Sequence, residues 1–197
     1  MKRIVFATNN AHKLDEMRAI AGGSLDIVSL SDIGCHDDIP EDADTLVGNA
    51  LAKARWVYAK YGCPCIADDT GLEVDALNGA PGVHTARYAG PGHDSVANVD
   101  LLLRNLVDVA DKDRTARFRT VIAYIDANGV EHNFNGTVEG TITRERIGDK
   151  GFGYDPVFMP EGWTETFAEA GADAKNAVSH RGRAARAFMQ WYEDQDK

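Results

Sequence analysis

Carboxylates crowd two places in this sequence where they could bind a metal ion. Asp68 and Asp69 directly follow residues 65–67, a short apolar run that predicts a buried strand. Residues 37–44 hold five carboxylates in eight positions. Ligands of α/β proteins bind beyond the carboxyl ends of strands, and Mg²⁺ prefers oxygen ligands, so the adjacent pair indicates a magnesium site. The alternatives are a plain turn at the pair, and solvation or helix capping in the acidic segment.

Donors and cations suited to phosphate stand where a helix is expected to begin. A predicted strand and helix are joined by Thr8, Asn9, Asn10, Ala11, His12 and Lys13. Helix N-termini present backbone N–H groups and the positive end of the dipole, which favours anions. Farther along, Asn49 and Lys53 are four residues apart and share a helix face. These groups could hold a triphosphate; an ordinary helix cap and solvated surface residues are the alternatives.

Two later segments combine aromatic rings, a carboxylate and cations. The first is a glycine-rich segment that reads Gly151, Phe152, Gly153, Tyr154, Asp155. Aromatic rings stack on nucleobases and a carboxylate accepts from a base edge, although a loop that fills the core is the alternative. In the second segment, Lys175, His180 and Arg181 fall near another expected helix start, where the dipole disfavours positive charge. A bound anion or a base carbonyl would explain cations there.

Composition limits the partners of the chain. Its 197 residues carry 21 Lys and Arg against 31 Asp and Glu, a formal charge of −10, which argues against a nucleic-acid polymer as partner. The three cysteines form neither a disulfide framework nor a zinc motif. Neither a signal peptide nor an apolar run near the roughly 20 residues of a membrane helix is apparent. We therefore expect one cytoplasmic domain over residues 1–197, without membrane contact.

The elements that must position these groups alternate between strands and helices. Apolar runs predict strands over residues 4–7, 25–30 and 65–67, and a long hairpin over 115–143 that turns at Asn128 and Gly129. Periodicity and capping residues predict helices over 14–21 and 45–61, from near Asp94, and from near Ser179. Such alternation is typical of an α/β fold.

Six segments, in this order, resemble one family closely. They are Phe6-Ala7-Thr8-Asn9-Asn10-x-x-Lys13-x-x-Glu16, Asn49-Ala50-Leu51-x-Lys53-Ala54, Ala67-Asp68-Asp69-Thr70-Gly71-Leu72, Pro81-Gly82-Val83-x-x-Ala86-Arg87-Tyr88, Gly151-Phe152-Gly153-Tyr154-Asp155-Pro156 and Ser179-His180-Arg181-Gly182. The pattern resembles the inosine triphosphate pyrophosphatases, also called XTP/dITP diphosphatases, over nearly the whole chain. One departure is Gly48, where many members carry Glu; glycine costs a helix about 1 kcal/mol.

The resemblance implies a fold and an activity. The fold is a long curved mixed central sheet with flanking helices and two lobes around a substrate cleft, assembled as a homodimer. The activity is Mg²⁺-dependent hydrolysis of ITP, dITP or XTP to the monophosphate and pyrophosphate. Such a reaction keeps these bases out of DNA and RNA. A different nucleotide pyrophosphatase, or a nucleotide sensor without turnover, is the competing hypothesis.

The resemblance also assigns roles by position. Phosphates would be held by Thr8, Asn9, Asn10, Ala11, His12, Lys13 and Lys53, and Thr70 would contact the substrate. The metal would be held by Glu41, Asp69 and Asp68, with Asp42 or Asp38 as alternatives to Glu41. Asp69 would accept the proton of the attacking water. The base would be enclosed by Phe152, Gly153, Tyr154, Asp155, Lys175, His180 and Arg181. Donors of Arg181 or His180 aimed at O6 would reject adenine.

Overall fold

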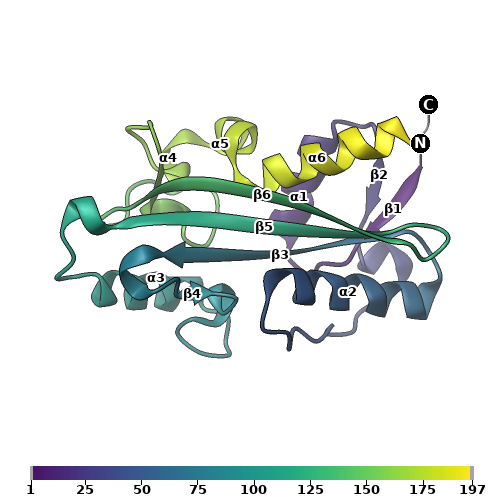
Figure 1. Cartoon of the computed structure of the whole chain (residues 1–197), viewed down its shortest axis with the longest axis horizontal. Helices are drawn as coiled ribbons and strands as arrows, with labels where there is room; N and C mark the ends of the chain where they lie inside the picture. Colours follow the sequence, from purple (N-terminus) through teal and green to yellow (C-terminus); the bar gives the residue numbers. More distant parts are fainter. Residues whose placement is uncertain (1, 196–197) are drawn as a thin grey trace. The chain divides into compact units, whose positions relative to one another are not determined.

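A mixed sheet flanked by helices forms the framework of the protein (Figure 1). The computed structural model describes residues 2–195. Across them the strand order is β2 (Asp26–Val28), β1 (Arg3–Phe6), β3 (Cys65–Val74), β5 (Thr115–Ile125), β6 (Glu131–Ile142) and β7 (Phe158–Pro160), with β4 (Pro81–Gly82) paired to β3. Strand β1 is parallel to β2 and β3, whereas β4 is antiparallel to β3 and β7 to β6. The prediction of an α/β fold on a mixed sheet is therefore confirmed.

The chain divides into two compact units. Unit 1 comprises residues 1–69, 120–136 and 180–197, and unit 2 comprises residues 70–119 and 137–179. The elements within unit 1 are β1 (Arg3–Phe6), α1 (Ala11–Ala21), β2 (Asp26–Val28), η1 (Ser31–Ile33), α2 (Leu46–Tyr61) and α6 (His180–Asp194). Three strands contribute residues to both units: β3 (Cys65–Val74), β5 (Thr115–Ile125) and β6 (Glu131–Ile142). No helix within residues 2–195 is long and apolar enough to cross a bilayer.

The remaining elements lie in unit 2. They are η2 (Asp75–Leu77), β4 (Pro81–Gly82), η3 (Thr85–Arg87), α3 (Ser95–Asn105), η4 (Asp111–Asp113), η5 (Asp155–Val157), β7 (Phe158–Pro160), α4 (Phe167–Ala170) and α5 (Ala172–Val178). Asp94 caps α3 as predicted, because its side chain accepts from the N–H groups of Val96 and Ala97, each at 3.0 Å. Helices α4 and α5 are additional to the predicted elements.

Alternation along β1 divides unit 1 into two helical layers. Ile4 and Phe6 pack in one core cluster with α1 and α6, while Val5 and Ala7 pack in another with α2. Figure 1 accordingly shows α1 and α6 over one face of the sheet in unit 1 and α2 over the other. Successive side chains of a strand point to opposite faces, so every residue of β1 after Arg3 is buried.

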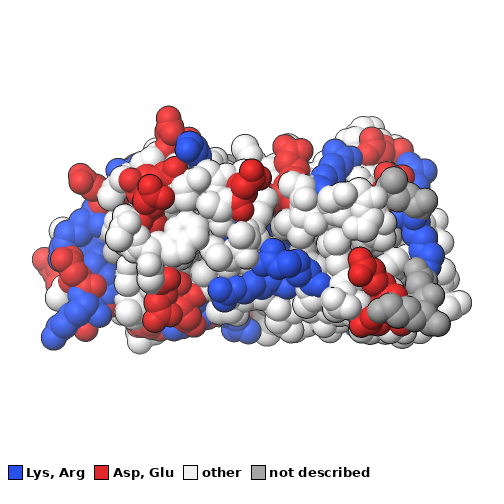
Figure 2. Space-filling view, turned by 90° about the horizontal axis from the view of Figure 1, so that it is seen from above, with Lys and Arg blue, Asp and Glu red and all other residues white. Residues whose placement is uncertain are grey.

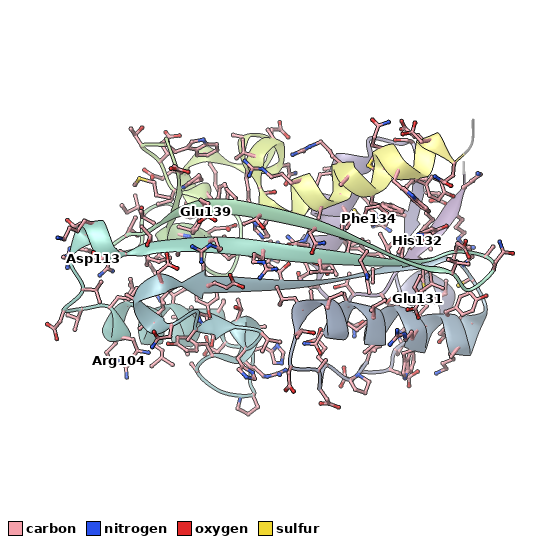
Figure 3. The ribbon with its side chains drawn as sticks, viewed as in Figure 1. Arg104, Asp113, Glu131, His132, Phe134 and Glu139 are labelled. Atoms are coloured by element: carbon pink, nitrogen blue, oxygen red, sulfur yellow. The ribbon has the colours of Figure 1, made fainter. Side chains whose placement is uncertain are left out.

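Aromatic side chains of helix α6 pack against those of strand β6 in unit 1. The His132 and Trp191 ring centroids are 4.3 Å apart, and Phe134 lies 5.5 Å from Trp191 and from Phe188 (Figure 3). At the other end of α6, a Cβ built on Gly136 would lie 2.0 Å from the His180 carbonyl oxygen. Only glycine permits this close approach, which fixes the start of α6 against β6.

The core of unit 2 depends on a buried arginine. Arg114 donates to four backbone carbonyls, those of Leu106, Val109, Ile142 and Thr143, at 2.6–3.4 Å. Leu106 follows the last turn of α3, so the guanidinium also neutralises the negative end of that helix dipole. Burial lowers the pKa of Arg114. The side chain thus ties the end of α3 to the end of β6.

Replacing Arg114 by Ala is expected to lower the free energy of unfolding by about 2–4 kcal/mol, because buried carbonyls lose their donors. Urea denaturation measures this loss. The control is Arg104→Ala, at an exposed position of α3, which should change stability by less than about 0.5 kcal/mol (Figure 3). Equal effects of the two variants would contradict the role given to Arg114.

Candidate active site

Strand β3 carries both carboxylates of the predicted metal pair, but on opposite faces. The strand runs from Cys65 to Val74 without a break at Asp68. The prediction that Asp68 and Asp69 lie beyond the end of the strand is therefore wrong. Successive residues of a strand alternate, so the two carboxylates point to different helices, although both lie close enough to Lys13 and Lys53 to oppose the lowering of each lysine's pKa by burial. Asp68 contacts α1 and α6, whereas Asp69 contacts α2.

Asp68 lies fully buried between two cations. Its Oδ1 accepts from Lys13 Nζ and its Oδ2 from Arg181 Nε, each at 3.1 Å, with the carboxylate 0% exposed. Arg181, itself 1% exposed, also donates to Glu16 of α1. Burial opposes ionisation of Asp68, but Lys13, Arg181 and Lys53 outweigh it and hold its pKa far below the usual range. This carboxylate is therefore charged and fixed.

Two helix starts bring the cations to Asp68. Asn10 caps α1 by accepting from the Lys13 N–H at 3.2 Å, and Thr8 Oγ1 accepts from the Asn10 N–H at 3.1 Å. Arg181 stands in the first turn of α6, where the dipole disfavours a cation. The carboxylates of Asp68 and Glu16 compensate for that position. Burial lowers the pKa of Lys13, and the neighbouring cations Lys53 and Arg181 lower it further.

Asp69 faces helix α2 and the acidic segment. Its Oδ2 accepts from Asn49 Nδ2 at 3.0 Å, and Asn49 Oδ1 accepts from the Ala43 N–H at 2.9 Å. Four residues along the same helix face, Lys53 donates to Glu41. The acidic segment, residues 37–44, thus contacts α2 and places the carboxylate of Glu41 on the buried Lys53.

Burial and charge oppose each other on this face. Burial raises the pKa of Asp69, and the lysines Lys53 and Lys13 only partly offset it. Burial alone would lower the pKa of Lys53, but Asp68, Glu41 and Asp69 hold it above its usual value. Burial would likewise raise the pKa of Glu41, yet Lys53 keeps it low. Among these carboxylates the pKa of Asp69 is raised whereas those of Glu41 and Asp68 are lowered, and a raised pKa favours a general base.

The oxygen ligands on the α2 face fit a hard cation such as Mg²⁺. Among residues 2–195, no three His, Cys, Asp or Glu side chains gather closely enough to hold a metal by themselves. Mg²⁺ commonly uses only one or two carboxylates, completed by waters and substrate phosphates. Glu41 and Asp69 lie close enough for Glu41 to raise the pKa of Asp69. Asp68 fits less well, because each of its oxygens already accepts from a cation.

Unit 2 gathers a second cluster of the predicted residues. Asp155 Oδ2 accepts from Lys175 Nζ at 2.7 Å and from the Phe152 N–H at 3.1 Å. The same ammonium lies 4.6 Å from the centre of the Phe152 ring. A Cβ on Gly151 would come within 2.2 Å of Asp155 Oδ2, so glycine lets the carboxylate fold back over the loop. A cation, a carboxylate and an aromatic face therefore meet at one place.

Two residues of the predicted base site have other surroundings than expected. Lys175 lies in the last turn of α5, where the dipole favours a cation, so its prediction at a helix start is wrong. Tyr154 is part of the core of unit 2, and its hydroxyl donates to the Thr85 carbonyl at 2.7 Å. The alternative of a core-filling loop thus describes Tyr154, whereas Phe152 is partly exposed.

The other predicted residues have simpler settings. Asn9, Ala11 and His12 are exposed around the start of α1, Thr70 follows Asp69 in β3, Gly153 is partly exposed, and His180 is buried at the start of α6. Sequence reasoning assigned no role to Glu16, which contacts Arg181, and none to Asn49 toward Asp69. No helix or strand spacing signals these two contacts, because the partners lie 165 and 20 residues away in the sequence.

The mixed sheet with flanking helices and the buried cation–carboxylate cluster on β3 define an α/β protein with a charged site. Residues 4–191 match the Ham1 family, and the chain belongs to this family. A relative from Porphyromonas gingivalis, named dITP/XTP pyrophosphatase, is 58% identical over 93% of this chain and 94% of its own. A Nocardia farcinica relative of the same name is 48% identical over 96% and 94%.

Solved structures agree with the family assignment. A HAM1 protein from Coxiella burnetii has a TM-score of 0.88 at 37% identity and covers 98% of this chain and 100% of its own. The Ham1 protein of Staphylococcus aureus has a TM-score of 0.87 at 34% identity, with the same coverage. The family resemblance stated from the sequence motifs is thus confirmed.

Asp68→Asn is expected to destabilise the protein by about 3–5 kcal/mol near neutral pH, because Lys13 and Arg181 lose a buried counter-charge. The folded-state pKa of Asp68 lies below its unfolded value near 3.9, so its contribution is present above that pH and is lost as the pH falls below it. Urea denaturation between about pH 7 and 2 should therefore show a shallower acid loss in the variant than in the wild type.

The control for this experiment is Asp26→Asn, at an exposed position of β2, which should leave stability within about 0.5 kcal/mol. Wild type and Asp68→Asn curves that run parallel throughout the acid range would contradict the buried ion pairs of Asp68.

Proposed function

We propose that this protein hydrolyses non-standard purine nucleoside triphosphates (ITP, dITP and XTP) to the monophosphate and pyrophosphate. The observation that carries the proposal is the cluster in unit 1 that holds Asp69 against Asn49 of α2 and, on the same helix face, the buried Lys53 against Glu41. A carboxylate next to the attacking water can accept its proton, and a raised pKa favours that role, while a buried ammonium stabilises phosphate charge. The names of the relatives, dITP/XTP pyrophosphatase, supply the substrate class.

In this proposal the groups of unit 1 bind and activate the phosphates. Lys13 and Lys53 donate to phosphate oxygens, together with the segment 8–12 at the start of α1. Asp69 takes the proton from the attacking water. Glu41 and Asp69 would hold Mg²⁺, which when bound neutralises phosphate charge and so lowers the barrier to attack. Asp68 holds Lys13 and Arg181 in place, and a direct bond from Asp68 to the metal stays a prediction.

The base is assigned to groups that can stack and form hydrogen bonds. Phe152 offers a ring face, and Asp155 with Lys175 offers an acceptor and a donor in a buried setting. Sites that bond a specific substrate group can reject an analogue by about 10⁴-fold, since their polar groups are otherwise left unpaired. Contacts from Thr70, Gly153, Tyr154, His180 and Arg181 to the substrate stay predictions.

Three further properties belong to the proposal. We place the reaction in the cytoplasm, in keeping with three free cysteines. We propose a homodimer on the family resemblance, which sedimentation at micromolar concentration would test. Nucleic-acid polymers are not proposed as partners, because the net charge is −10 and acidic and basic side chains are interspersed on the face in Figure 2.

Pyrophosphate release from ITP, dITP, XTP, ATP and GTP, with and without Mg²⁺, tests the activity. The wild type should release pyrophosphate from the first three far faster than from ATP, and only with the metal. Asp69→Asn should lower kcat with ITP by about 10²–10⁴-fold, because the variant lacks the proton acceptor. Asp26→Asn, exposed on β2, serves as the matched control and should retain wild-type turnover.

Near-full turnover by Asp69→Asn with Mg²⁺ would refute the assignment of the base. A wild type that binds ITP but releases no pyrophosphate from any of the five triphosphates would favour the sensor hypothesis. Preferential hydrolysis of ATP would place the chain with a different class of nucleotide pyrophosphatase.

A further inference from the structure

Asn49 connects two separate parts of the cluster in unit 1. Its Nδ2 donates to Asp69 Oδ2 at 3.0 Å, and its Oδ1 accepts from the Ala43 N–H at 2.9 Å. Ala43 stands two residues after Glu41 in the acidic segment, and Asp69 belongs to strand β3. One side chain therefore spans the two backbone segments that carry Glu41 and Asp69.

The chemistry of the amide suits both contacts at once. One end of the amide must donate to a carboxylate and the other must accept from a backbone N–H. A carboxylate at this position could accept from Ala43 but could not donate to Asp69. An aliphatic side chain of similar size could make neither bond. Asn49 is only 1% exposed and is a weak helix former, so its place on α2 is explained by these two hydrogen bonds.

Gly48 gives a second, independent sign that the acidic segment is seated on α2 at this point. A Cβ on Gly48 would lie 2.8 Å from the Ala43 Cβ and 2.9 Å from Thr45 Oγ1, the oxygen that caps the helix. Because Gly48 has no side chain, Ala43 can occupy the space where a Cβ of residue 48 would lie. The departure from the family pattern at Gly48 thus has a local cause, namely the close approach of the segment that carries Glu41.

We propose that Asn49 is a positioning residue that sets the distance between Glu41 and Asp69. It fixes one oxygen of Asp69, and so the direction of the other, while it holds the Glu41 segment against α2. Asn49 acts through these groups and does not touch the substrate. The inference rests on the proposed function, in which Glu41 and Asp69 hold the cation and Asp69 accepts the proton.

Two substitutions distinguish the hydrogen bond of Asn49 to Asp69 from its hydrogen bond to Ala43. Asn49→Asp keeps an acceptor for Ala43 but replaces the donor to Asp69 with a second carboxylate, while Asn49→Leu removes both bonds. A displacement of catalytic groups by about 1 Å can cost 10²-fold in rate. We therefore expect both variants to lower kcat for ITP by about 30- to 300-fold, with KM changed by less than about threefold.

Hydrogen exchange of the segment 38–44 provides a readout independent of turnover. Exchange at Ala43 should accelerate in Asn49→Leu, which loses the acceptor, and should stay near the wild-type rate in Asn49→Asp. Gly48→Ala should also accelerate exchange in this segment, because its Cβ displaces Ala43. Asn49→Leu in an Asp69→Asn background should cost little further activity, since the partner is already changed.

The matched control is Asn98 in unit 2, a buried asparagine with the same two kinds of bond. Its Nδ2 donates to the Ala86 carbonyl at 2.9 Å and its Oδ1 accepts from the Ala89 N–H at 2.7 Å. Asn98→Asp should lower the thermal stability about as much as Asn49→Asp but leave kcat within about threefold of the wild type.

Wild-type kcat in both Asn49 variants, or an equal loss of kcat in Asn98→Asp, would overturn the proposal by reducing Asn49 to a stability residue. Unchanged exchange at Ala43 in Asn49→Leu would overturn it as well. Failure of the proposed function is a separate outcome, since the wild type itself would then release no pyrophosphate while the exchange difference between the Asn49 variants persists.

Discussion

The buried charge of Asp68 is the constraint on which unit 1 depends. A carboxylate with no exposure must be compensated inside the protein, and the compensation comes from Lys13 on α1 and Arg181 on α6. Those helices are distant in sequence but pack in one core cluster with β1 and β3. The charge therefore requires both helix starts to meet at the same strand, and the apolar layer beneath them holds that arrangement.

Because side chains alternate along β3, the adjacent carboxylates of Asp68 and Asp69 have different partners. Asp68 points to the α1 and α6 layer and fixes cations, while Asp69 points to α2 and keeps a raised pKa. The two neighbours differ because Asp68 accepts directly from two cations, whereas Asp69 accepts from a neutral amide. Because side chains alternate along the strand, one carboxylate has a strongly lowered pKa and its neighbour a raised one, which favours proton transfer.

The sequence predicted the fold class, the hairpin and most helices, because these follow from local patterns such as the apolar run of β1 and the cap at Asp94. It missed the length of β3, since Asp and Gly have low strand propensity and the strand continues only through tertiary pairing. It also missed the roles of Asn49 and Glu16. Their partners, Asp69 and Arg181, are 20 and 165 residues away, beyond the reach of any helix or strand period.

For phosphate binding, the positions of the acidic side chains matter more than the net charge of −10. Lys13 and Lys53, which we propose for the phosphates, are both ion-paired in the structure, so a phosphate chain must compete with carboxylates for them. The Glu41 side chain is 31% exposed whereas that of Asp68 is 0% exposed. Rehydrating Glu41 should cost less than uncovering a buried charge, so under the proposed function we expect phosphate to displace Glu41 from Lys53 before it separates Asp68 from Lys13. A displaced Glu41 would then be available to a cation, and the proposed binding of phosphate and of the metal would be linked through Lys53.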